Sequence, residues 1–242
     1  MGENLAHHHV RTLHLVQATE DATELLAMGI ARIATPGWQA RAGQPALQTI
    51  AAGVEKLAKL TLGMMDEFDT GAFPDPKTLK EWGHNIDGLT RSLGNRLEQR
   101  AAGDGRPDIL RLKHSLDVDP FWPGLREALD TAADARAGRY VHESALGGVR
   151  PLGRPIHEMW QVLDDKAIAR LGLASAIAGP ESRDALCRVR TEIIGTVVRW
   201  WHLLFRVWQH GLAGPTARQL STEVRLQWDT LPPSLEALAK RL

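Results

Sequence analysis

The sequence predicts an all-α fold, and two observations carry this prediction. Apolar residues recur at intervals of three and four along most of the chain, which is the period of an amphipathic helix. Runs of β-branched residues are short, and almost no segment alternates between apolar and polar residues as a strand would. We therefore expect helices and no sheet.

The first part of the chain is expected to hold four helices, at about residues 5–34, 45–68, 76–97 and 124–139. The third has the clearest pattern, because Leu79, Ile86 and Leu93 belong to one apolar stripe. Asp75 is suited to cap its first turn, and Pro76 is suited to its first helical position. These features together predict that this helix begins at Asp75 and Pro76.

The second part of the chain is expected to hold two longer and two shorter helices, at about residues 156–173, 181–210, 216–228 and 234–242. Residues 147–155 contain three Gly and two Pro, a composition typical of a boundary. We therefore predict a helical bundle over residues 1–146. A helical C-terminal extension over residues 147–242 is predicted to pack on it.

The charge balance limits the classes of protein that the chain can belong to. Its 242 residues carry 29 Lys and Arg against 29 Asp and Glu, which excludes a uniformly basic nucleic-acid coat and an acidic disordered chain. This neutrality is a cancellation, because residues 1–145 sum to −4 and residues 146–242 to +4. If RNA binds, we expect the basic second part to supply much of the attraction.

No membrane segment, metal or cofactor is expected. The most apolar stretch, residues 193–208, is interrupted by Arg199, His202 and Arg206, whereas a span needs about 20 apolar residues with few charges. Cys187 is the only cysteine, so no internal disulfide and no Cys-based zinc site can form. A reducing cytoplasm is the expected location. The chain has no phosphate loop, dinucleotide fingerprint or nucleophile elbow.

The helix at about 181–210 is rich in tryptophan and admits two interpretations. Arg199, His202 and Arg206 alternate with Trp200, Trp201, Phe205 and Trp208, and basic residues with aromatics can bind single-stranded nucleic acid by stacking. The pattern also fits an ordinary amphipathic helix with a core face and a solvated face. We favour the second interpretation. The wide apolar face could in addition serve a dimer or partner interface.

Three segments resemble the HEPN superfamily of helical domains. Val54–Leu60 looks like the E-x-x-x-K helix of these domains, and Trp82–Leu89 looks like their G-H-[DN] segment. Arg136–His142 is similar to the R-x(4–6)-H segment of the catalytic members. The order of the segments and the interval between the first two also fit.

The resemblance implies an up-and-down helical bundle that commonly dimerises. Many members are metal-independent endoribonucleases of toxin–antitoxin or anti-phage systems, and others are non-catalytic modules that bind a protein or a nucleotide. It further implies that His142 is the general acid/base at the ribose 2′-hydroxyl and that Arg136 stabilises the phosphate charge. A homodimer would complete the site. RNA, an antitoxin or another protein would be the partner.

Five further residues are candidates for binding through the resemblance: Glu55, Lys59, His84, Arg139 and Tyr140. For His84 a structural role is favoured, in which it bonds Glu55 or Lys59 between neighbouring helices, because buried polar groups need partners in any bundle. The alternative for Arg136 and His142 is an exposed helix C-terminus, where basic side chains complement the helix dipole.

Overall fold

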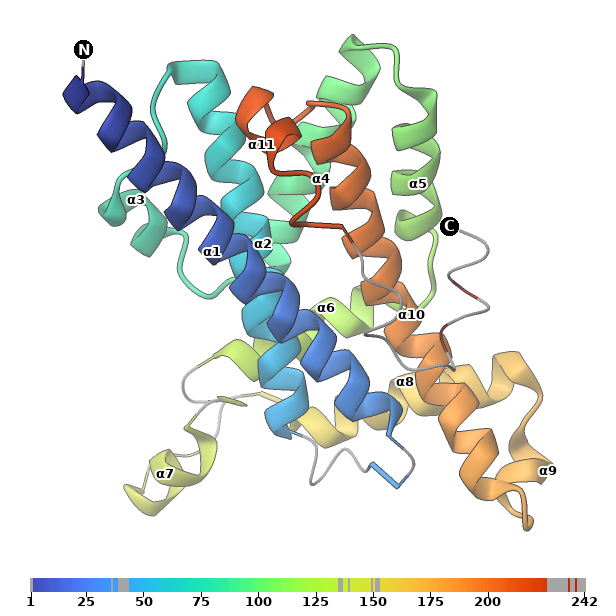
Figure 1. Ribbon diagram of the computed structural model, residues 1–242. Coiled ribbons are helices and arrows are strands. Elements are labelled where there is room, and N and C mark those ends of the chain that lie inside the picture. The colour runs from blue at the N-terminus through green and yellow to red at the C-terminus, as the bar shows by residue number, and fades with distance from the viewer. Residues whose placement is uncertain are drawn as a thin grey trace.

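The computed structural model describes residues 2–35, 37–38, 44–134, 137–138, 140–148, 150, 153–225, 235 and 238. In these residues the chain forms eleven helices and no strand, so the all-α prediction is confirmed. The helices pack as a bundle (Figure 1). They are α1 (Gly2–Ala34), α2 (Gln44–Thr70), α3 (Pro76–Glu81), α4 (Ile86–Gly103), α5 (Pro107–Asp117), α6 (Trp122–Ala133), α7 (Val141–Leu146), α8 (Ile156–Leu171), α9 (Ala174–Ile177), α10 (Ser182–Gln209) and α11 (Pro215–Gln219).

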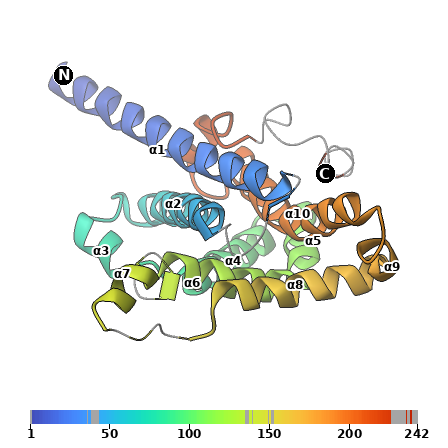
Figure 2. The same cartoon turned by 90° about the horizontal axis from the view of Figure 1, so that it is seen from below.

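The helices α1 and α2 form the most extensive pair in the bundle. Their backbones approach closely at two glycines. A Cβ on Gly29 would lie 2.4 Å from a side-chain carbon of Ile50, and a Cβ on Gly53 would lie 2.9 Å from the Ala22 carbonyl oxygen. Both sites therefore require a residue without a side chain. The N-terminal half of α1 extends beyond this pair (Figure 2).

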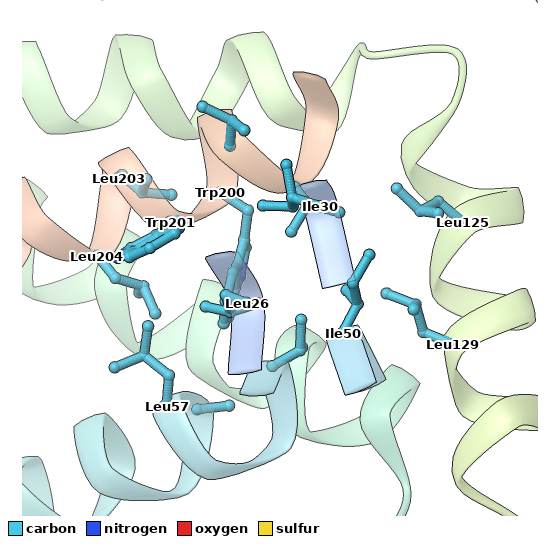
Figure 3. Packing of buried hydrophobic residues seen from close by; sticks show 14 of the residues in the cluster. Leu26, Ile30, Ile50, Leu57, Leu125, Leu129, Trp200, Trp201, Leu203 and Leu204 are labelled. Atoms are coloured by element: carbon cyan, nitrogen blue, oxygen red, sulfur yellow. The ribbon is translucent and has the colours of Figure 1, made fainter. Parts of the chain in front are cut away.

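A single cluster of buried apolar side chains joins the helices. α2 packs against α4 and α6, α8 packs against α6 and α10, and α10 also packs against α1 and α5. Leu26, Ile50, Leu129, Trp200 and Leu204 converge in this core from four different helices (Figure 3). The core thus takes residues from both sides of position 146, and the division into two parts at that position stays a prediction.

The third predicted helix is interrupted, which corrects the prediction of one continuous helix over 76–97. Asp75 caps α3 as expected, because its side chain accepts a hydrogen bond from the Thr78 backbone N–H at 2.7 Å. The chain then turns, and Gly83 adopts a φ of 59°, which favours glycine and ends a helix. Asn85 caps α4 by accepting from the Gly88 backbone N–H at 2.7 Å.

Two further regions differ from the predicted helices. Residues 107–117 lie outside every predicted helix, yet they form α5, which has Pro107 in its first turn. The helix predicted at 124–139 is wrong at its end, because α6 stops at Ala133. Gly138 lies buried against this end, where a Cβ would come within 2.3 Å of the Thr131 carbonyl oxygen. Ala137 and Gly138 are π-helical, so they do not continue α6 as an α-helix.

The helix expected at 216–228 is shorter than predicted within the described residues. α11 begins at Pro215 and ends at Gln219, residues 220–225 are not helical, and residues 226–228 lie outside the described residues. Most of the helix predicted at 234–242 lies outside the described residues, although Leu235 and Leu238 are buried. None of the helices in the described part of the chain combines the length and the apolarity that spanning a bilayer requires.

Candidate functional site

Three candidate binding residues meet where α2 faces the turn before α4. The His84 Nδ1 lies 2.9 Å from the Glu55 Oε2, and the Lys59 Nζ lies 2.9 Å from the Glu55 Oε1. The Glu55 side chain is only 12% exposed, whereas that of His84 is 54% exposed. The expected structural contact between His84 and Glu55 is thus present, and it fixes the turn at residues 82–85 to α2.

The first turn of α4 connects this network to the next layer of the bundle. The Asp87 Oδ2 accepts a hydrogen bond from the Arg91 Nε at 2.7 Å, and the Asp87 Oδ1 lies 3.3 Å from an Arg126 terminal nitrogen. The Asp87 backbone N–H also donates to the Asp130 Oδ1 at 3.2 Å. Asp87 therefore holds the start of α4 against α6.

The residues of the third motif are only partly described. Arg136 and Arg139 lie outside the described residues, so the geometry of the Arg136–His142 pair does too. His142 and Tyr140 are exposed. His142 belongs to α7, which projects from the lower left of the bundle, well below α3 in the view of Figure 1. The segment that carries His142 is thus separate from the network around Glu55 and His84.

The tryptophan-rich helix α10 contributes to the core, as the favoured interpretation predicts. Trp200, Trp201 and Trp208 are at most 3% exposed. The indole N–H of Trp201 donates to the Val224 carbonyl at 2.8 Å, and that of Trp208 donates to the Thr61 hydroxyl at 3.0 Å. The Trp201 and Trp208 rings, which are buried and bonded in this way, cannot stack on a nucleic-acid base, which excludes the alternative for these two tryptophans.

The basic residues of α10 are also engaged inside the protein. The Arg199 guanidinium pairs with the buried Asp119, which further accepts a hydrogen bond from the Thr196 hydroxyl at 3.1 Å. Burial, and secondarily the neighbouring Arg206 charge, lowers the pKa of His202. This pattern is typical of polar groups that join helices rather than of a surface that binds a polyanion.

A cavity of about 300 Å³ lies between α4, α5, α6 and α10. Its charged lining consists of Arg91, Lys113, Asp117 and Arg126, and Leu93, Leu116, Trp122, Trp200 and Leu203 contribute apolar walls. We call this space the arginine cavity. The Trp122 and Trp200 rings stack with their centroids 6.3 Å apart and form the aromatic part of the lining.

Arg126 is the most buried cation of the arginine cavity, with a side chain 12% exposed. Its guanidinium lies 5.5 Å from the centroid of the Trp122 ring, and its Nε is buried without a hydrogen-bond partner among the described residues. Burial lowers the pKa of Arg126, Asp87 raises it and Arg91 lowers it further. An Arg stays charged at neutral pH all the same, and Asp87 is its one ion-pair partner among the described residues.

Lys113 stands across the cavity on α5. Its Nζ lies 2.6 Å from Asp117 and 2.9 Å from Glu98. Burial lowers the pKa of Lys113, but the hydrogen bonds to both carboxylates outweigh this effect and raise the pKa overall. With Asp117 as its only acidic lining residue among those described, the cavity has a net positive lining.

Arg126, Lys113 and Trp122 do not figure among the candidates predicted from the sequence. The sequence does contain one indication of this site: Trp122 and Arg126 are four residues apart and so share a helix face. Their convergence with Lys113 and Trp200 depends on how four helices pack, which a motif does not encode. Among the described residues, no group of three or more His, Cys, Asp or Glu side chains is placed to hold a metal ion.

Comparison with known proteins adds no relative: no family model, no curated protein and no solved structure matches the chain. The protein is therefore described by its own fold and site. It is an all-α protein with a helical bundle and a cation-lined cavity between four of its helices.

Proposed function

We propose that the chain is a non-catalytic, HEPN-like helical module that binds a small anion with a flat aromatic part, such as a mononucleotide, in the arginine cavity. The observation that carries this proposal is the buried Arg126, whose Nε has no hydrogen-bond partner among the described residues. A buried cation that lacks a hydrogen-bond partner is stabilised most by an anion that can bond to it. A phosphate is suited to the planar fork of an arginine.

The dimensions and the walls of the arginine cavity fit this ligand class. Its volume of about 300 Å³ lies at the lower end of the range for small-molecule sites. Lys113 and Arg91 would supply further positive charge near the anion. Trp122 and Trp200 line the cavity and would supply apolar contacts to a flat ring. The resemblance to a superfamily with nucleotide-binding members supports the same choice.

The proposal is tested by calorimetric titration with AMP, adenosine and inorganic phosphate. We expect AMP to bind more tightly than either of its parts, because only AMP uses both the cation and the aromatic wall. Arg126→Gln removes a charge-assisted hydrogen bond worth about 1.5–3 kcal/mol, which corresponds to a loss of about ten- to a hundredfold in affinity. Arg126→Lys, which keeps the charge, should lose less.

The matched control is Arg111→Gln, which neutralises an exposed arginine on α5 outside the cavity lining. This variant should bind AMP as the wild type does, and circular dichroism verifies that each variant is folded. Equal AMP affinity in Arg126→Gln and the wild type would refute the proposal. So would the absence of heat with every mononucleotide at millimolar concentration.

A second candidate function is a metal-independent endoribonuclease of a toxin or anti-phage system, with Arg136 and His142 in the catalytic roles that the resemblance implies. It is favoured by the exposure of His142 on α7, since an acid/base must reach its substrate. RNA cleavage in EDTA by the wild type and His142→Ala tests it. His114→Ala, which changes an exposed histidine on α5, is the control. Equal cleavage by all three proteins would remove the role of His142.

The expected partners and location belong to this proposal as well. A homodimer would bring two copies of the Arg136–His142 segment together in the ribonuclease. RNA or an antitoxin would be its partner, and another protein could be the partner of the non-catalytic module. The cytoplasm is the location that the lone Cys187 favours.

A further inference from the structure

A group of buried polar atoms lies where α8, α10 and the segment after α1 meet. It consists of the indole nitrogens of Trp38 and Trp160, the Nε of Arg190 and the Oδ1 of Asp164, and none of these atoms has a hydrogen-bond partner among the described residues. They are four of the seven buried side-chain atoms without a partner in that part of the chain, so such atoms concentrate here. We call the four residues the α8–α10 polar cluster.

The members of the polar cluster lie next to one another. The Trp38 and Trp160 rings meet edge to face with their centroids 5.0 Å apart, and the Arg190 Cζ lies 5.4 Å from the centroid of the Trp38 ring. Asp164 follows Trp160 by four residues on α8, so the two share a helix face. Trp38, Trp160 and Arg190 are at most 6% exposed, so bulk water does not reach their unpartnered atoms.

Donors outnumber acceptors in the polar cluster. The two indoles and the Arg190 Nε each carry an N–H group that can only donate a hydrogen bond, whereas Asp164 supplies the one carboxyl group. Buried donors without an acceptor are unfavourable, so the cluster selects a ligand that accepts several hydrogen bonds. A water molecule accepts two at most, because its other bonds are donated. An anion can accept all three.

We propose that the α8–α10 polar cluster binds a small monovalent anion, such as chloride. The indole N–H groups and Arg190 donate to the ion, and the guanidinium supplies the opposite charge. The close contacts among the rings and Arg190 favour an ion of about the size of a water molecule over a larger one. Asp164 is half-buried and connects the cluster to the solvent. This inference does not depend on the arginine cavity or on any catalytic role of His142.

The charge of Asp164 decides when the anion binds. An ionised Asp164 neutralises Arg190 and repels an anion, whereas the protonated acid is neutral and can itself donate a hydrogen bond. Burial raises the pKa of Asp164 to about 6, Arg190 opposes this effect and the Asp165 charge adds to it. Burial lowers the pKa of Arg190, and Asp164 and Cys187 raise it. The anion thus enters together with a proton, and its apparent affinity should fall about tenfold for each pH unit above about 6.

The test is the binding of chloride, followed by the line broadening of ³⁵Cl NMR signals at pH 5 and pH 7.5 and at constant ionic strength. We expect the wild type to bind chloride at least about tenfold more tightly at pH 5. Asp164→Asn is neutral at both pH values, so its affinity should be the same at both and should exceed that of the wild type at pH 7.5.

Two conservative variants test the donors. Trp160→Phe and Trp38→Phe each keep an aromatic ring and remove an indole N–H, and each should weaken chloride binding by about tenfold. The matched control is Arg188→Gln, which neutralises an exposed arginine of α10 and should bind chloride as the wild type does. Circular dichroism verifies that the variants are folded, and either Trp→Phe variant is sufficient for the test.

Bromide locates the ion. Crystals grown at pH 5 and soaked in bromide should show an anomalous peak beside the Trp160 indole nitrogen and the Arg190 Nε. A water molecule at this position would overturn the proposal. Chloride affinity that is unchanged in the folded Trp→Phe variants would do so too, as would a pH dependence that persists in Asp164→Asn.

Discussion

Asp164 on α8 is a carboxylic acid enclosed between α8 and α10, and removing its charge is expected to stabilise the protein at neutral pH. Burial raises the pKa of Asp164 to about 6, against the opposing effects of Arg190 and Trp160. Arg190 on α10 is itself only 6% exposed. The Asp164 Oδ1 is buried and has no hydrogen-bond partner within the described structure. The carboxylate is therefore held in an environment that favours its neutral form.

The size of the effect follows from the two pKa values. The pKa of Asp164 rises from 3.8 to about 6 on folding, and a difference of about two pH units corresponds to about 3 kcal/mol. The folded state holds this proton at pH values where the unfolded chain has lost it. The contribution of Asp164 to the free energy of unfolding therefore falls as the pH rises from about 4 to about 6, and stays low above that.

Asp164→Asn removes this titration. We expect the variant to have a higher free energy of unfolding than the wild type at about pH 7, by up to about 3 kcal/mol, and a difference close to zero at about pH 4. Urea unfolding followed by circular dichroism at both pH values measures this. Asp165→Asn, at an exposed neighbouring position, should change stability by less than about 0.5 kcal/mol. A less stable Asp164→Asn variant at neutral pH would show that the Arg190 pair outweighs burial and would refute the reasoning.

Three further substitutions test the packing around the site. Gly138→Ala brings a Cβ against backbone carbonyls at the end of α6. We expect thermal unfolding to show that the free energy of unfolding falls by about 2 kcal/mol or more. Unchanged stability would contradict the close approach. Asp119→Ala leaves the Arg199 charge without its buried partner and should cost about 3–5 kcal/mol in urea unfolding, whereas a loss below about 1 kcal/mol would count against this account. His84→Ala removes only a half-exposed contact to Glu55 and should cost about 1 kcal/mol or less, so a protein unfolded by this change would assign His84 a larger role.

The long helices could be predicted from the sequence because each buries one continuous stripe. α1, α2 and α10 end within a few residues of their predicted bounds, since their apolar residues keep the helical period and Gly or Pro follows. The interruption before α4 was not predicted, because Trp82 and Ile86 continue the apolar period through it. The helical spacing of the apolar residues therefore gives no indication of the turn at Gly83 and Asn85.

The candidate site was predictable only where a motif places two residues on adjacent helices. The contact of His84 with Glu55 was expected for this reason. Arg126 was not, because its significance comes from burial among four helices. The net charge of the second part of the chain is likewise an incomplete guide, since Arg199 is basic in the sequence and yet pairs with an acidic residue inside the fold.

The most direct measurement of the central claim is ¹⁹F NMR of the protein labelled with fluorotryptophan, with AMP added stepwise. The chain has eight tryptophans, and single Trp→Phe variants assign their signals. If AMP binds in the arginine cavity, the signals of Trp122 and Trp200 move with saturation, while those of Trp38 and Trp160, which pack together in another part of the core, stay in place. Saturating shifts at Trp38 and Trp160 alone, or no shift of any signal, would contradict the claim.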